Sequence, residues 1–275
     1  MRLRRILFAT ALCAALATPA FPQLDLPGGR SCKRSGDGAI TIAFDLSPIV
    51  RTEAVTDAPY SAVRSQQSVQ TLADGAHLTR SGRMETATWR DSNGRVRTEI
   101  RVPPGERRPS PCDSSLVEIE DPVAGYVYLL DSVDRVAYRL PLTTLPRATK
   151  RTAAQKAASP PAQTSPDEAA PARESLGEKT MFGITVTGTR TVVTYPVGSR
   201  IGNDRPVTTT EEDWVSPELH VNLYSQRTNY DGSVSTTSLK DLSVAEPDPS
   251  LLQVPPGYRI IDESGSFTIQ IPSQS

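Results

Sequence analysis

A long extended run in the second half of the chain limits the folds that this sequence can adopt. Residues 184–195 consist mainly of threonine and valine, which fit a pleated sheet surface, and they show no helical periodicity. Gly183 comes just before the run, and a loop rich in glycine, asparagine and proline leads to a second β-rich run at 207–214. The second run returns in the opposite sense, which predicts antiparallel pairing of two strands.

Turn signals elsewhere extend this sheet. Three dipeptides of the type that favours tight hairpins, in which both turn positions need positive φ, separate extended runs: Asp74-Gly75, Asn93-Gly94 and Asp231-Gly232. The run at 126–131 alternates large apolar residues on both faces, which predicts the centre of a core. Asp248 followed by Pro249 predicts a single helical turn. We therefore predict a mainly β fold, an antiparallel, strongly curved, open half-barrel of about ten strands, because strands this long must coil or split.

The first 20 residues have the pattern of a secretory signal. A basic start, an apolar run of 12 residues and small residues up to Ala20 predict export and cleavage after Ala20. The alternatives are a membrane anchor, for which the run falls short of the roughly 18 residues needed, and a lipoprotein acylated at Cys13, which lies inside the apolar core of the signal. We expect a periplasmic or extracellular protein, with no membrane span in the mature chain.

Composition divides the remainder of the chain. Residues 21–37 are rich in proline, glycine, arginine and serine and are expected to form a flexible N-terminal segment. Residues 146–173 contain no large apolar residue, so that burial cannot offset the entropy cost of ordering them. We therefore predict that they form a disordered linker. Residues 38–275 are then one β domain that this linker interrupts.

Cys32 and Cys112 are the two cysteines that remain after signal removal. In an oxidising compartment they predict a disulfide, which would stabilise by about 4 to 5 kcal/mol through loop closure. The alternative is two unpaired thiols, because polar or proline-rich sequence flanks both residues.

Charge and composition exclude some partners. A formal net charge of -1 offers no basic field for nucleic acid. Aromatic residues make up 5% of the chain, so that there are few bulky anchors for a large protein interface.

The residues that could carry chemistry do not form a catalytic set. His77 and His220 lie in extended runs among polar neighbours, and a zinc site has too few ligands. The start of a calcium loop at Asp91 fails because its twelfth position is Val102, which favours a plain turn. The acid cluster of Glu211, Glu212 and Asp213 places its two glutamates on opposite faces of a strand, so that an exposed edge or a pair with Arg190 or Arg205 is the simpler account. We expect no enzyme, no cofactor and no metal; an enzyme would need a pocket of perturbed acids around this cluster.

Short motifs in the second half resemble the periplasmic lipoprotein-carrier half-barrels, the superfamily of outer-membrane lipoprotein sorting. In those carriers a strand after a glycine turn, a pair of strands with the pattern W-spacer-L-x-V, and a terminal V-P-x-G-Y follow in this order. The matching positions here are Gly183, Trp214, Leu219, Val221, Val254, Pro255, Gly257 and Tyr258. The resemblance covers residues 176–258 well and 60–140 loosely, and it implies the half-barrel architecture and the carrying of a lipid.

These observations lead to a functional hypothesis. We expect a non-catalytic binding protein of the cell envelope or secreted medium that holds a lipid-like or apolar ligand in a concave sheet. The residues expected to face this ligand are Ile184, Val186, Trp214, Leu219, Val221 and Leu223, whose alternative role is ordinary core packing. The alternative function is a structural or sensory module that docks an envelope protein without a small ligand.

Overall fold

The computed structural model describes residues 29–34, 40–45, 49–52, 54–82, 85–101, 117–132, 134–145, 171–199, 201–264 and 267–271. It leaves undescribed the side chains of 29–52, 143–145 and 269–271. The predicted signal at 1–20, residues 146–170 of the predicted linker and Cys112 lie outside the described residues, as does the side chain of Cys32. The signal, the linker, the disulfide and the single-domain division therefore stay predictions.

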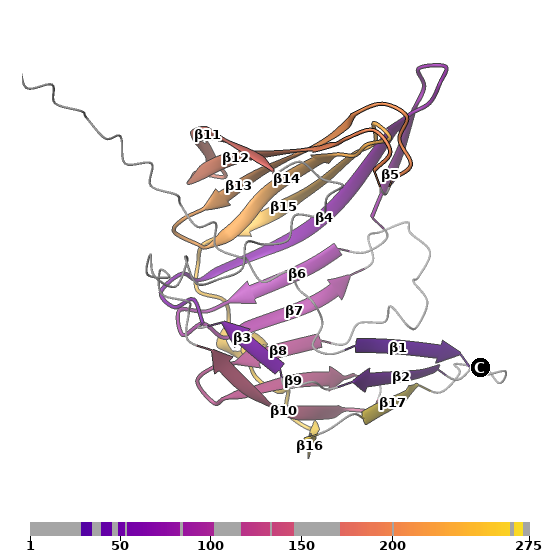
Figure 1. Cartoon of the computed structure of the whole chain (residues 1–275). Helices are drawn as coiled ribbons and strands as arrows, with labels where there is room; N and C mark the ends of the chain where they lie inside the picture. The colour runs from indigo at the N-terminus through magenta and orange to yellow at the C-terminus, as the bar shows by residue number, and fades with distance from the viewer. Residues whose placement is uncertain are drawn as a thin grey trace, which may run out of the picture.

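The described residues form seventeen strands and one short 3-10 helix (Figure 1). The strands of the first half are β1 (Gly29–Arg34), β2 (Ile40–Asp45), β3 (Ile49–Thr52), β4 (Tyr60–Thr71), β5 (His77–Ser81), β6 (Glu85–Arg90), β7 (Val96–Arg101), β8 (Val117–Asp121), β9 (Tyr126–Asp131) and β10 (Val136–Leu145). The elements of the second half are β11 (Ala172–Met181), β12 (Ile184–Tyr195), β13 (Val207–Ser216), β14 (Val221–Thr228), β15 (Val234–Ser243), the 3-10 helix η2 (Pro249–Leu252), β16 (Arg259–Asp262) and β17 (Phe267–Ile271).

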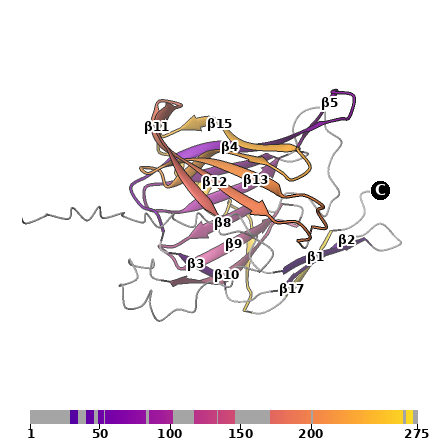
Figure 2. The same cartoon turned by 45° about the horizontal axis from the view of Figure 1, so that its top comes forward.

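A large curved sheet dominates the molecule. Its 14 strands follow the order β11-β12-β13-β14-β15-β4-β6-β7-β8-β9-β10-β16, with β3 also paired to β10 and β5 also paired to β4. Figure 2 shows β11, β12, β13, β15 and β4 at one end of the curve and β8, β9 and β10 at the other. The sheet does not close, because β11 and β16 each have one neighbour. The predicted open, curved, mainly β fold is confirmed.

The strand count and the strand directions differ from the prediction. The large sheet alone has 14 strands where about ten were expected, and β10 pairs in parallel with both β3 and β16. Part of the excess arises because the extended run at 76–90 is two strands, β5 and β6, which both pair with β4. Strand β1 lies inside the segment expected to be flexible, and β11, which begins at Ala172, includes the last two residues of the expected linker.

The predicted hairpins form, with a different turn geometry. Among the described residues of these three turns, only the glycines Gly75, Gly94 and Gly232 have positive φ, whereas positive φ was expected at both turn positions. In the β6–β7 hairpin Gly94 N donates to Asp91 O and Asp91 N donates to Arg95 O. This pattern is a three-residue loop, a type I turn followed by glycine in the left-handed region. The preceding residue therefore needs no positive φ.

Apolar contacts hold together the part of the sheet that contains β8, β9 and β10. β9 is buried on both faces, as predicted, since Leu129 and Leu130 are both inaccessible to solvent. The segment after η2 packs on the sheet through Val254 and Tyr258, which contact a cluster that includes Ile119 of β8. The ring of Tyr138 in β10 stacks on Phe267 of β17 at 4.8 Å, so that the small sheet β1-β2-β17 contacts the large one.

The predicted helical turn is confirmed as η2. Asp248 precedes it, and the Asp248 carboxylate accepts a hydrogen bond from Ser250 N at 2.9 Å. This bond holds the pKa of Asp248 below its ordinary value, because it favours the charged carboxylate. The carbonyl oxygen of Leu251 accepts from the Arg97 side chain at 3.0 Å, which fixes η2 against β7.

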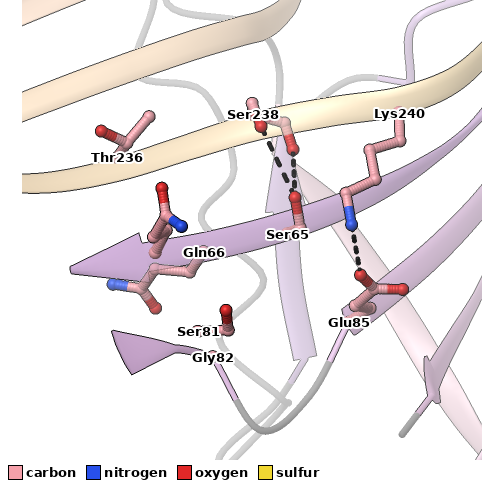
Figure 3. A pocket seen from close by; sticks show the side chains of 9 residues that line it. Ser65, Gln66, Ser81, Gly82, Glu85, Thr236, Ser238 and Lys240 are labelled. Atoms are coloured by element: carbon pink, nitrogen blue, oxygen red, sulfur yellow. Dashed lines mark hydrogen bonds and ion pairs between the residues drawn. The ribbon is translucent and has the colours of Figure 1, made fainter. Parts of the chain in front are cut away.

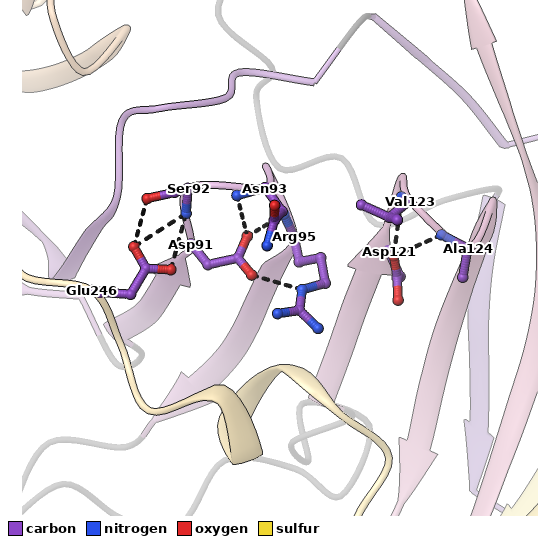
Figure 4. Close-up of polar contacts among 8 residues, drawn as sticks. All are labelled: Asp91, Ser92, Asn93, Arg95, Asp121, Val123, Ala124 and Glu246. Carbon is purple, nitrogen blue, oxygen red and sulfur yellow. Dashed lines mark hydrogen bonds and ion pairs between the residues drawn. The ribbon is translucent and has the colours of Figure 1, made fainter.

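Two aspartates stabilise neighbouring hairpin turns (Figure 4). The Asp91 carboxylate is buried and accepts hydrogen bonds from Asn93 N and Arg95 N, and its other oxygen lies 2.6 Å from Arg95 Nε. Asp121 accepts from the backbone of Val123 and Ala124 in an exposed turn. The calcium-loop alternative for Asp91 is not needed, since the turn itself uses this carboxylate.

Replacing Asp91 by asparagine should lower the free energy of unfolding by about 1 to 2 kcal/mol, because the amide keeps one acceptor oxygen but loses its charged contact with Arg95. Urea denaturation measures the change. Asp121→Asn is the matched control, since no described residue forms a salt bridge with this turn aspartate, and it should change stability less. Equal losses in the two variants would contradict the role given to the Asp91–Arg95 pair.

Candidate functional site

The six residues predicted to face a ligand are brought together in one apolar cluster. Five of them are buried members of it, and Ile184 is partly buried and packs against it. The cluster, called the apolar cluster below, consists of Ala58, Ala62, Val186, Trp214, Leu219, Val221, Leu223 and Leu239. These residues come from β4, β12, β13, β14 and β15 and from the turns beside them. Core packing therefore describes the buried five, and a ligand role for the set stays a prediction.

Partly buried apolar side chains surround the apolar cluster. They leave some apolar surface accessible, and they are Val55, Tyr60, Leu176, Met181, Ile184, Tyr224 and Leu242. Of the six predicted residues only Ile184 belongs to this accessible set. A ligand that contacts the cluster would touch these residues first.

Trp214 fills the space above Gly188. The two residues face each other across the β12–β13 pair, and a Cβ at position 188 would lie 2.6 Å from two atoms of the indole ring. The Lys179 ammonium lies 3.4 Å from the centre of the same ring, in a cation–π contact. Trp214 is 8% exposed, because glycine below and lysine beside it cover its faces. Position 188 is therefore a glycine because any larger side chain would overlap the Trp214 ring.

Arg90 of β6 ties the turn at Leu219 to the start of β4. The side chain is buried, at 6% exposure, and its guanidinium donates to Ala58 O at 2.9 Å and to Leu219 O at 2.5 Å. Its charge lies 4.6 Å from the ring centre of Tyr60. Burial lowers the pKa of Arg90, and Tyr60 partly opposes this effect. Sequence reasoning missed this residue, because the strand that it ends, ETATWR, is largely polar and gave no sign of an inward arginine.

Arg64 adds a second positive charge beside the apolar cluster. It faces Leu239 across the β4–β15 pair. Tyr60, Ala62 and Arg64 are every second residue of β4, so that they share one face of the strand. Its guanidinium makes one long contact of 3.5 Å with Asn222 O. Burial lowers the pKa of Arg64 and raises that of Tyr60, whose pKa the two arginines also pull down. Among the described residues neither arginine has a carboxylate in salt-bridge contact.

Two residues of the acid cluster at 211–213 have separate polar partners in the structure. Glu212 pairs with Arg190 at 2.7 Å, as the simpler account predicted, and Asp213 accepts from Asn222. His77 is exposed in β5, next to the hydroxyl of Thr71. Nowhere in the described parts of the chain do three or more histidine, cysteine, aspartate or glutamate residues gather so that they could hold a metal ion.

The described part of the chain contains no helix with the length and apolar character that a membrane crossing needs.

Comparison with known proteins finds several solved structures of low similarity. No protein-family model matches the chain, and no curated protein matches it. A LolA superfamily protein from Nitrosomonas europaea matches with 12% identity and a TM-score of 0.25, over 73% of this chain and 92% of that one. The lipoprotein LppX from Mycobacterium tuberculosis matches with 8% identity and a TM-score of 0.23, over 67% and 89% of the two chains.

A third solved structure is MucB in complex with MucA(peri), at 14% identity and a TM-score of 0.33. The match covers 71% of this chain and 54% of MucB. At these identities and TM-scores the likenesses carry no argument about a ligand or a partner of this chain. The resemblance to the lipoprotein carriers rests on the sequence motifs given above.

Proposed function

We propose that this protein is a non-catalytic binding protein of the cell envelope, which holds a lipid-like ligand with an apolar chain and an anionic head group. The apolar chain would lie on the partly buried side chains around the apolar cluster. The head group would lie at Arg64, beside Arg90. The predicted signal peptide supports export to the envelope.

The observation that carries this proposal is the pair of arginines at the edge of the apolar cluster. Both are buried enough for their pKa values to fall, and no described carboxylate neutralises either of them. A charge that is partly removed from water favours an anion, and a guanidinium binds carboxylate or phosphate through a planar fork of donors. Arg90 already donates to two carbonyl oxygens, so that Arg64 has more free donors for a ligand.

Replacing Arg64 by glutamine should weaken the binding of oleate by about tenfold, because one charge-assisted contact is lost. The binding of oleyl alcohol, which has the same chain length and no charge, should stay unchanged. Isothermal titration of both compounds against the mature protein measures the two affinities.

Arg227→Gln is the matched control, because Arg227 is an exposed arginine on β14 outside the apolar cluster. It should leave both affinities as they are. Equal affinity of the unmodified protein for oleate and oleyl alcohol would contradict an anionic head-group site, and an absence of binding to both would contradict the lipid-like ligand.

One observation favours a second function, the docking of an envelope protein at a sheet edge. Strand β11 has ten residues, is mostly exposed and, among the described strands, pairs with β12 alone. Such an edge presents unpaired backbone groups to which another chain could add a strand. Its charged residues and the irregularity at Ser175/Gly177 reduce this tendency, so that we place docking second.

Native mass spectrometry of the protein from its own secretory compartment, without detergent, separates the two functions. A lipid-sized adduct that is lost on denaturation would support the binding protein. A complex with a second protein chain and no such adduct would support docking at the edge.

A further inference from the structure

A cavity that is open to solvent and lined by polar residues lies on the large sheet, outside the apolar cluster. It has a volume of about 310 Å³ and lies where β4 changes its partner strand. Residues Tyr60 to Arg64 of β4 pair with β6, and residues Gln67 to Thr71 pair with β5. Figure 3 shows the lining, which consists of Ser65, Gln66, Gln67, Ser81, Gly82, Glu85, Thr236, Ser238 and Lys240. None of these residues belongs to the apolar cluster.

Strand register explains why these polar groups meet. Thr236 faces Gln67 across the β15–β4 pair, and Gln67 faces Ser81 across the β4–β5 pair. Ser238 faces Ser65 in the same way. Directly paired residues share one face of a sheet, so that one row of hydroxyl and amide groups crosses three strands.

The side chains of the cavity have free hydrogen-bonding capacity. Within the described residues, no group is hydrogen-bonded to the side-chain amides of Gln66 and Gln67 or to the hydroxyls of Ser81 and Thr236. The hydroxyl of Ser65 makes only long contacts of 3.5 Å with Ser238. Amides and hydroxyls both donate and accept, so that the lining can meet either kind of group.

Charge and polarity restrict what this cavity can bind. The two charged residues of the lining neutralise each other, since Lys240 Nζ lies 2.6 Å from Glu85 Oε1. The Glu85 carboxylate would repel an anion, and the Lys240 ammonium would repel a cation. An apolar chain would leave the amides and hydroxyls without partners, which costs free energy. The lining thus suits a neutral ligand with many groups that donate and accept.

We propose that this cavity binds a neutral polyhydroxylated ligand, such as a sugar unit of a glycan. Each sugar hydroxyl can donate one hydrogen bond and accept others, as the lining requires. The volume is at the lower end of the roughly 300 to 1,000 Å³ of small-molecule sites, which fits one or two sugar rings. Because the cavity is open to solvent, the remainder of a longer glycan could extend out of it. The site is separate from the proposed lipid-like ligand and does not depend on it.

NMR titration of the isotope-labelled mature protein tests the proposal. The probes are chitotetraose, cellotetraose and maltotetraose, added one at a time. We expect at least one of them to shift the backbone amide signals of Gln66, Gln67 and Thr236 with a Kd of roughly 1 mM or tighter. The absence of shifts at these residues with all three probes would overturn the proposal.

Variants of two lining residues and one control make the test specific. Gln67→Ala and Thr236→Val should each weaken the bound sugar by about fivefold to tenfold, because each removes one hydrogen-bonding group. Gln70→Ala is the control, since Gln70 is an exposed glutamine on the same strand and does not line the cavity. Unchanged affinity in both lining variants, or an equal loss in Gln70→Ala, would overturn the proposal. A protein that binds one of these sugars but not oleate would support this site and contradict the proposed lipid-like ligand site.

Discussion

Leu223→Ala is expected to lower the free energy of unfolding by about 2 to 5 kcal/mol, the range of buried leucine truncations. Leu223 is fully buried, at 0% exposure, in the middle of the apolar cluster. Its removal would take apolar contacts from β14 and leave a cavity that the neighbouring strands cannot fill. Chemical denaturation of the mature protein, followed by circular dichroism, measures the loss.

Leu72→Ala is the matched control for this variant. Leu72 follows β4 and is 43% exposed, so that the same chemical change there should alter stability by no more than about 0.5 kcal/mol. A loss below about 1 kcal/mol for Leu223→Ala would show that this position is not a packed core. The residue would then belong to an open ligand surface, and the description of the buried five as core would be wrong.

Gly188→Val is expected to destabilise the protein by about 3 kcal/mol or more, at the upper end of the overpacking range. Even a single Cβ would lie 2.6 Å from the Trp214 ring and 2.9 Å from Leu176 Cβ, so that the indole must leave its place. The displaced ring would also lose its contact with Lys179. Thermal unfolding measures the loss, and tryptophan fluorescence reports the exposure of the ring.

The control for Gly188→Val is the same substitution in a Trp214→Leu background. Leucine leaves room above position 188, so that the second substitution should cost less there than in the natural protein, and the difference measures the coupling of the two positions. An equal cost in both backgrounds would show that the Trp214 ring is not the obstacle. Unchanged stability of Gly188→Val would contradict the close contact itself.

Local patterns predicted the strands whose signals lie within a few adjacent residues. The run of threonine and valine at β12 has the predicted bounds, and the Asp248–Pro249 pair gave η2. The break between β5 and β6 had a local signal, the Ser81-Gly82 dipeptide, which the prediction did not use. The parallel pairing of β10 with β3 and β16 could not be predicted, because it joins segments that are far apart in the chain.

The candidate site was predictable in its apolar part only. Trp214 and Leu223 were two of the six apolar residues expected to face a ligand, and both belong to the apolar cluster, whereas their ligand role stays a prediction. Arg64 was missed because an arginine in a polar strand is usually solvated, and its inward position follows from its partner Leu239. The polar cavity was missed because Ser65 and Ser238, 173 residues apart in sequence, meet only in the folded sheet.

The β4–β15 pair has a consequence for how the protein becomes folded in its compartment. It joins the first long strand of the sheet to the last, across a sequence separation of 173 residues. Sheets that depend on such distant pairs form slowly, because the loop between the partners must close first. Until β15 is available, β4 has an unpaired edge that invites aggregation. A chain that emerges from its N-terminus would therefore expose this edge of β4 until the residues of β15 have also emerged.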